Sequence, residues 1–442
     1  MPNLLAGAAS VEITPPAGVM MDGYGARTQP SQGVHDELMV RVAVFEQGAE
    51  SAAIVSVDAL AMHPWITAEV RRRAAELGIR PDGVLVAATH NHATPVGLRA
   101  GMFTRLSAPL AEELVTRISG AIAQAWSARR PATLGVASAT VSTISLNRRD
   151  PAWPIDPELR VVLVDSEEGP IATLVNFACH ATILDATNLQ LSGEFPGAAA
   201  RLLQRETGAP CVYLNGACGD INPAWIRQDF KSVERAGQIV GGQALRLVAE
   251  MRALGPGQRS HNVRWDEFPA VAPLGRAVAP SLRAARREVE LPVREFEADE
   301  AYATRIDEAK AADAAAAPES AERRAAAALI SRYEAERWSA VWARRAPTPT
   351  TSELQAIRLG DGLAVVALPG EFFAETGAAL REAAGIADLI VAGYANDYLG
   401  YVVPEHAYAE GGYEAGLTFY GAGADAIIRE AGAALLREVC DG

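Results

Sequence analysis

Short apolar, β-rich runs alternate with helical patterns along most of the chain, and this alternation constrains the fold more than any other feature. Strand-then-helix order of this kind is typical of an α/β fold, in which layered mixed sheets are surrounded by helices. Several strands end in clusters of polar residues, and such carboxyl ends are where sites gather in open α/β sheets. We expect strands at residues 39–45, 52–57, 84–88, 159–164, 172–177, 211–214, 364–367 and 389–392, and helices at 64–77, 108–125, 197–207, 232–251, 375–384 and 422–439.

One segment departs from this order. Residues 297–345 are rich in Ala, Glu and Arg, and Pro318 lies in the middle. This pattern predicts two helices joined near the proline, which ends the first and begins the second. We interpret the segment as a helical hairpin inserted into a single catalytic domain that spans residues 1–442, with a lid or a dimerisation arm as the alternatives. Residues 255–291, just before it, contain several prolines and indicate an irregular connection.

Charge and targeting signals narrow the possible partners. The formal net charge of −14 argues against nucleic acid or an anionic membrane surface, since both favour a basic face. The N-terminus has no basic region before an apolar run, and no 18-residue apolar stretch occurs, so we expect a cytoplasmic protein without a spanning helix. The four cysteines show no CxxC spacing and are expected to be reduced core thiols. An oligomer is possible.

Two segments place histidines at strand ends. In AATHNHATP, residues 87–95, a buried strand leads into His90 and His92, whose i, i+2 spacing lets both address one site. In NFACHATIL, residues 176–184, another apolar strand delivers His180. Imidazole is a common zinc ligand, so these residues are candidate metal ligands. The alternatives are a polar turn for the first pair and a hydrogen-bonded structural histidine for the second.

Three further segments carry candidate side chains. Glu371 in LPGEFF follows a strand and a Pro-Gly turn, where it could be a ligand or could cap the next helix. Tyr398 and Tyr401 lie in GYANDYLGYVVP, a loop in which tyrosines often serve packing. The glycines of NGACGDINP, residues 215–223, would let the backbone approach a ligand closely, although no Walker or dinucleotide-binding signature is present.

Taken in order, these motifs resemble the catalytic domain of the neutral (non-lysosomal) ceramidase family, which acts on a sphingolipid. The opening AGAASVEITPPAGVMMDGYG and the later YVVPEHAYAEGGYEAGLTFYGAGA are similar to that family as well. The resemblance covers about residues 5–250 and 350–435, so it leaves out the helical segment.

The resemblance implies a zinc-dependent hydrolase of lipid metabolism in which metal-activated water attacks an amide carbonyl. It assigns His90, His180, Glu371 and Tyr401 as ligands of a single zinc ion. It also implies that His92 hydrogen-bonds water or the developing oxyanion, that Arg148 of LNRR lines the site, and that Tyr413 is an oxyanion donor.

Two departures bear on the substrate and the mechanism. The family's GD-x-S-P serine is replaced by Asn222, so a serine nucleophile is not available there, and Asp220 and Asn222 are expected to support the site. Known ceramidases continue into a C-terminal β-sandwich and are secreted or membrane-facing. We therefore expect an amidase for an N-acylated compound that need not be ceramide.

Two rival interpretations remain. A binuclear amidohydrolase on a TIM barrel also places HxH after a strand, but this chain has only seven histidines, and its two lysines lie in helical patterns. A non-catalytic binding protein on the same fold is the other alternative.

Overall fold

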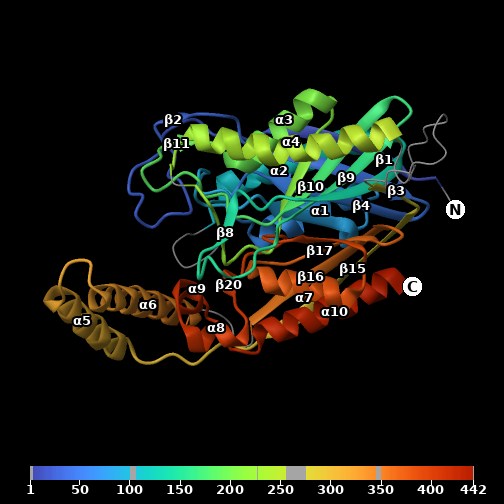
Figure 1. The fold of residues 1–442 in the computed structure, drawn as a ribbon. Helices are drawn as coiled ribbons and strands as arrows, with labels where there is room; N and C mark the ends of the chain where they lie inside the picture. The colour runs from blue at the N-terminus through green and yellow to red at the C-terminus, as the bar shows by residue number, and fades with distance from the viewer. Residues whose placement is uncertain (1–2, 100–105, 226, 255–274, 345–349, 442) are drawn as a thin grey trace, which may run out of the picture.

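Three β-sheets make up the body of the protein (Figure 1). The structure, a computed structural model, describes residues 3–99, 106–225, 227–254, 275–344 and 350–441. The first sheet has the order β5 (Val84–Ala88), β4 (Glu50–Val57), β3 (Met39–Gln47), β1 (Leu5–Glu12), β6 (Arg130–Pro131). The second is β12 (Cys211–Asn215), β10 (Gly169–Phe177), β9 (Glu158–Ser166), β7 (Thr133–Thr140), β14 (Gly275–Val278). The third is β15 (Pro280–Leu291), β16 (Thr350–Gly360), β17 (Leu363–Ala367), β19 (Asp388–Ala392).

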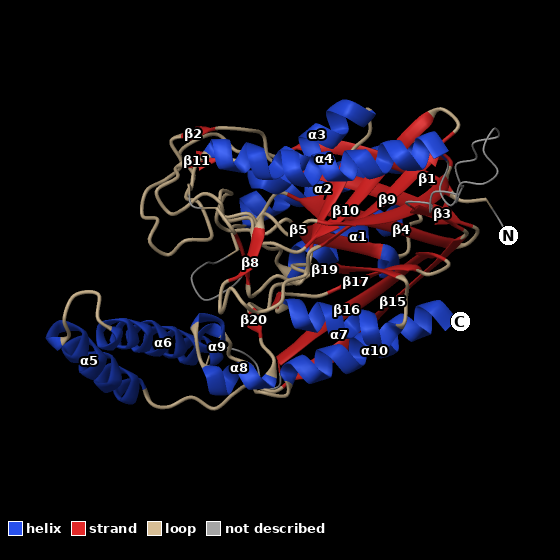
Figure 2. Cartoon of the chain, viewed as in Figure 1, coloured by secondary structure: helices blue, strands red, loops and turns tan. Residues whose placement is uncertain are grey.

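The three sheets share one apolar core, and helices cover their other faces (Figure 2). Strand β3 shows how the sequence dictates this arrangement, because successive side chains of a strand point to opposite faces. Ala43 and Phe45 join the core between the sheets, whereas Val42 and Val44 join the core that includes the helices. The covering helices are α1 (Pro64–Glu76) and α2 (Ala108–Ser127) on the first sheet, α3 (Glu194–Thr207) and α4 (Phe230–Leu254) on the second, and α7 (Ala374–Ala384) and α10 (Ala424–Asp441) on the third.

Each sheet contains one strand–helix–strand unit with parallel strands. These units are β4–α1–β5, β10–α3–β12 and β17–α7–β19. Other neighbouring strands in the three sheets run antiparallel, so the sheets are mixed, as predicted. In the described residues no sheet closes into a barrel, which argues against the TIM-barrel alternative.

The described residues also form three two-stranded pairs. They are β2 (Gly33–Val34) with β11 (Gln190–Leu191), β8 (Ser145–Asn147) with β13 (Ile221–Pro223), and β18 (Glu371–Phe372) with β20 (Tyr401–Val402). A 3-10 turn, η1 (Pro81–Gly83), precedes β5.

The predicted helical hairpin is present. Helix α5 (Asp299–Ala315) and α6 (Ala321–Ala343) flank Pro318 and extend away from the sheets (Figure 1). Ser320, rather than the proline, caps α6 by accepting a hydrogen bond from the main-chain nitrogen of Arg323. The base of α6 packs on α9 (Tyr413–Leu417), next to α8 (Glu405–Glu410).

The prediction of an irregular connection over residues 255–291 is wrong for its second part. Residues 275–291 form β14 and β15, while 255–274 lie outside the described residues. Strand β15 is an edge strand with one solvent-facing side, and its arginines and glutamates conceal the alternation that would otherwise mark a strand.

Two other expectations concern cysteines and membranes. All four cysteines are free, with Cys179, Cys211 and Cys218 buried and Cys440 partly exposed. Within the described residues no helix is long and apolar enough to cross a membrane. The cytoplasmic location, the oligomeric state and the single-domain assignment stay predictions.

Candidate metal centre

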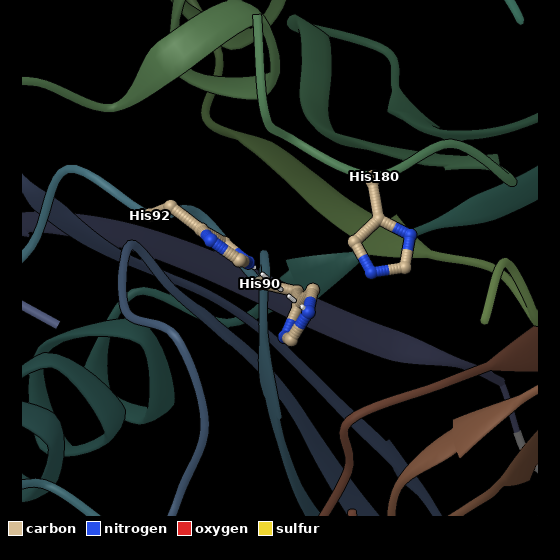
Figure 3. Close-up of side chains that lie close together, drawn as sticks. All are labelled: His90, His92 and His180. Carbon is tan, nitrogen blue, oxygen red and sulfur yellow. Dashed lines mark hydrogen bonds between the residues drawn. The ribbon is translucent and has the colours of Figure 1, made fainter. Parts of the chain in front are cut away.

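The candidate site lies where the carboxyl ends of the parallel strands meet. His90 follows β5, His180 follows β10 and Glu371 follows β17, so each strand–helix–strand unit supplies one side chain. A bridge between Asn91 and Ala181 holds the two histidine-bearing loops together. Figure 3 shows His90, His92 and His180 converging from these loops.

The three histidines could hold a metal ion, because their nearest ring nitrogens all lie within 4.8 Å of one another. His90 and His180 are buried, and His92 is partly buried. Nε2 of His92 lies 3.4 Å from Nε2 of His90, so the two predicted partners do address one site. The predicted reason is wrong, however: His90 has a φ of +58°, and a turn at His90 rather than extended backbone brings the rings together.

The predicted ligands His90, His180 and Glu371 converge on one point. Oε2 of Glu371 lies 3.1 Å from Nε2 of His180 and 3.5 Å from Nε2 of His90. All three side chains are at most 4% exposed. Glu371 does not cap a helix, since it lies on β18 and faces the imidazoles.

Backbone carbonyls fix the protonation of both imidazoles. Nδ1 of His90 lies 2.9 Å from the carbonyl oxygen of Leu60, and Nδ1 of His180 lies 2.7 Å from that of Cys218. A carbonyl can only accept, so each Nδ1 carries a proton, and in both rings Nε2 is the nitrogen that points inward toward Glu371.

This arrangement fits a cation. Burial lowers the pKa of His180 to about 4, so its ring is neutral at pH 7. The lone pair of Nε2 therefore faces a carboxylate oxygen, which is another acceptor. A divalent metal ion between these atoms would reconcile them, and nitrogen and oxygen donors of this kind suit zinc.

Tyr401 lies beside Glu371. The two residues are direct register partners in the parallel pair β18–β20. Arg148 donates a 2.8 Å hydrogen bond from Nη2 to the hydroxyl oxygen of Tyr401. Burial raises the pKa of Tyr401 well above its usual value, and the Arg148 cation opposes that shift.

Arg148 and Tyr413 lie beside Tyr401. The Arg148 guanidinium lies 5.6 Å from the ring centroids of both Tyr401 and Tyr413. Its Nε donates at 2.7 Å to Glu414, a buried carboxylate that also pairs with Arg149 at 2.8 Å. Tyr413 is 51% exposed, so its ring is open to solvent.

The GDINP segment is structural here. Asp220 accepts hydrogen bonds of 2.8 Å from the main-chain nitrogen of Ala374, at the start of α7, and from the side chain of Asn147. Asn222 accepts from Arg148 at 3.3 Å. Gly219 packs against the backbone of β18, where a β-carbon would lie 3.0 Å from the carbonyl oxygens of Glu371 and Phe372. The absence of a side chain at Gly219 therefore lets this loop pack closely against β18, rather than against a ligand.

Three contacts at the site were not predicted. The Tyr398 hydroxyl donates to Oε1 of Glu371, the Tyr394 ring stacks on His90 with centroids 3.8 Å apart, and Asn215 binds both histidine-bearing loops. All three residues lie in the motifs GYANDYLGYVVP and NGACGDINP, but their partners become visible only in the folded chain.

Comparison with known proteins agrees with the motifs. Residues 4–217 match the family described as neutral/alkaline non-lysosomal ceramidase, N-terminal. The neutral ceramidase of Pseudomonas aeruginosa is 24% identical over 473 aligned positions that cover 94% of this chain and 69% of that protein. The chain is similar to the neutral ceramidases.

A solved neutral ceramidase also shares the fold. The crystal structure of the Pseudomonas aeruginosa protein superposes with a TM-score of 0.76 at 20% identity, covering all of this chain and 75% of that one. Neutral ceramidase 2 of Arabidopsis thaliana is 30% identical over 228 positions, which cover 45% of this chain and 30% of the plant protein. The matched region thus spans less than a third of that plant ceramidase.

Proposed function

We propose that the protein is a zinc-dependent amidase that hydrolyses the amide bond of an N-acylated substrate. One observation carries the proposal: three buried donor groups converge, with Oε2 of Glu371 3.1 Å from Nε2 of His180 and 3.5 Å from Nε2 of His90. The kinship with neutral ceramidases supports amide hydrolysis as the reaction.

His90, His180, Glu371 and Tyr401 are the proposed zinc ligands. Two neutral imidazoles and one carboxylate leave a bound zinc ion most of its charge. A zinc ion held in this way supplies Lewis acidity, which polarises a carbonyl and lowers the pKa of water.

The surrounding residues are proposed to accept a proton, to orient the Tyr401 hydroxyl and to donate a hydrogen bond to the oxyanion. Burial and the two neighbouring imidazoles lower the pKa of His92 well below its usual value, so its ring is neutral and able to accept a proton or a hydrogen bond. Arg148 orients the Tyr401 hydroxyl through the 2.8 Å hydrogen bond. The exposed Tyr413 phenol is the proposed donor to the oxyanion that develops on the substrate carbonyl.

The substrate is proposed to be a small or lipid-like N-acyl compound that need not be ceramide. We further propose that residues 1–442 act as one catalytic domain, with the hairpin α5–α6 as an insertion within it.

Metal analysis tests the centre directly. We expect about one zinc ion per wild-type chain and strongly reduced zinc in His90→Ala and Glu371→Ala. His406→Ala, which changes an exposed histidine on α8, is the matched control and should keep its zinc. Wild-type zinc content in both site variants would reject the ligand assignment.

Substrate screening tests the reaction. Short N-acyl amides and long-chain ceramide should be compared with the same zinc-loaded protein. We expect the short amides to be hydrolysed faster, and a clear preference for ceramide would overturn that part of the proposal. No hydrolysis of any N-acyl compound by zinc-loaded protein would overturn the amidase assignment.

Tyr401→Phe tests whether Tyr401 acts as the fourth zinc ligand or only stabilises the fold. We expect an unchanged thermal midpoint in the metal-free form and weaker zinc binding or a lower rate in the loaded form. Unchanged activity and zinc affinity would remove Tyr401 from the site.

A further inference from the structure

The two carboxylate oxygens of Glu371 have different partners. Oε2 faces the imidazoles of His90 and His180, whereas Oε1 accepts a hydrogen bond from the hydroxyl of Tyr398. An ionised carboxylate can only accept, so the Tyr398 hydroxyl is the donor. One oxygen is thereby directed toward the candidate metal position, and the other is engaged by the protein.

Several contacts fix the position of the Tyr398 hydroxyl. The Arg99 guanidinium lies over the Tyr398 ring at 5.2 Å from its centroid. Arg99 is held in turn by Asp22 through two hydrogen bonds of 2.9 and 2.8 Å. The main-chain nitrogen of Tyr398 also donates to the Asp397 carboxylate at 2.7 Å. The donor is thus anchored at both its ring and its backbone.

We propose that Tyr398 is a positioning residue that restricts Glu371 to binding the metal through Oε2 alone. This inference rests on the proposed function. Carboxylates bind metals through one oxygen or through both. A catalytic zinc site needs an open position beside its protein ligands, and a second carboxylate oxygen would fill it. The hydroxyl of Tyr398 holds Oε1 away from that position.

The test compares Tyr398→Phe with the wild type after loading with Co²⁺ or Zn²⁺. We expect the variant to bind one Co²⁺ per chain with weaker visible d–d absorption, since an added ligand lowers the intensity of four-coordinate Co²⁺. With Zn²⁺, kcat on an N-acyl amide should fall on the order of 10–100-fold, while KM stays unchanged.

Tyr213→Phe is the matched control, because Tyr213 is fully buried on β12 and its hydroxyl donates a long, 3.5 Å hydrogen bond to the carbonyl oxygen of Phe177 rather than to Glu371. It should keep the wild-type spectrum and kcat. If Tyr398→Phe does not fold, Asp22→Asn weakens the Arg99 support and should change the spectrum in the same direction.

The possible failures are distinct. A Tyr398→Phe variant with wild-type spectrum and kcat would overturn the positioning role and leave the proposed function intact. Loss of Co²⁺ from a folded Tyr398→Phe variant would also overturn it, because the hydroxyl would then be a ligand. A wild-type chain that binds neither Co²⁺ nor Zn²⁺ would refute the metal function itself.

Discussion

The side-chain amide of Asn215 donates a 3.1 Å hydrogen bond to the carbonyl oxygen of Thr89, the residue before His90. The same nitrogen donates at 3.1 Å to the carbonyl oxygen of Cys179, the residue before His180. Asn215 ends β12 and is fully buried, so one amide sets the separation of the two histidine-bearing loops.

Asn215→Asp should weaken metal binding by roughly 10–100-fold, because a carboxylate cannot donate to either carbonyl and the loops lose their common partner. Each unsatisfied buried group should also cost about 1–3 kcal/mol of stability. Zinc titration and thermal unfolding measure the two effects.

Asn176→Asp is the matched control for that variant. Asn176 is also buried and donates to two carbonyls, those of Leu214 and Val391, which do not adjoin the histidines. It should lose similar stability but keep its zinc affinity. Equal zinc loss in both variants would mean that Asn215 acts only through general stability.

Gly23→Ala should displace His92 and lower activity. A β-carbon at Gly23 would lie 2.5 Å from Cγ of the His92 ring, closer than any real contact. Gly18→Ala is the control, since Gly18 has a similar positive φ (+102° against +98°) but has no atom within 4 Å of the added carbon. Both variants should lose about 1–2 kcal/mol through backbone strain. Only Gly23→Ala should lose kcat, and equal activity in the two would contradict the steric argument.

Ala335→Leu should disrupt the contact between the hairpin helix α6 and helix α9. The Ala335 β-carbon lies where a side chain at Gly416 would clash, at 2.9 Å, so the α6–α9 contact has no room for larger residues. Overpacking of this kind costs about 1–3 kcal/mol, and displacement of α9 would move Glu414 away from Arg148. We expect lower thermal stability and lower kcat. Ala328→Leu, at an exposed position on α6, should change stability by no more than about 0.5 kcal/mol. If Ala328→Leu lowered stability and kcat as much as Ala335→Leu, the α6–α9 contact would have no specific role in the site.

His406 should make stability depend on pH. Although partial burial opposes the charge, hydrogen bonds to Glu410 at 3.0 Å and Glu375 at 3.1 Å raise the pKa of His406 above 6.5. Because the pKa of His406 is higher in the folded state, protonated His406 stabilises the fold. This stabilisation is fully present below the unfolded pKa and is lost as pH rises through the folded pKa. The side chain is 45% exposed, so solvent limits the effect to a few tenths of a kcal/mol. Urea unfolding of wild type and His406→Gln from pH 6 to 9 should show this decline in the wild type alone.

Periodic apolar patterns were sufficient to predict most of the fold. Strands such as β5 and β10 are buried on both faces, and helices such as α2 carry one apolar stripe, so the sequence records both directly. Strand β15 was missed because its exposed side carries arginine and glutamate, and β16 was missed beside it. Burial of such strands depends on their neighbours rather than on their own composition.

In the candidate site too, some residues were predictable from the sequence and others were not. His90, His180 and Glu371 follow apolar strands in short motifs, and the structure brings them together. Asn215 and Tyr398 are not marked by spacing, because their partners come from other segments of the chain. The left-handed backbone of His90 likewise has no local signal, since the residue at that position is not the glycine that usually marks a positive φ.

The origin of the proposed ligands in separate sheets has a consequence for the order of assembly. During synthesis, the two imidazoles at positions 90 and 180 emerge well before the carboxylate at position 371 and the phenol at position 401. Under the proposed ligand assignment, tight zinc binding would therefore await docking of the third sheet. Once bound, the ion would link the two ends of the chain, and its removal should loosen the contact between the third sheet and the other two before either part unfolds.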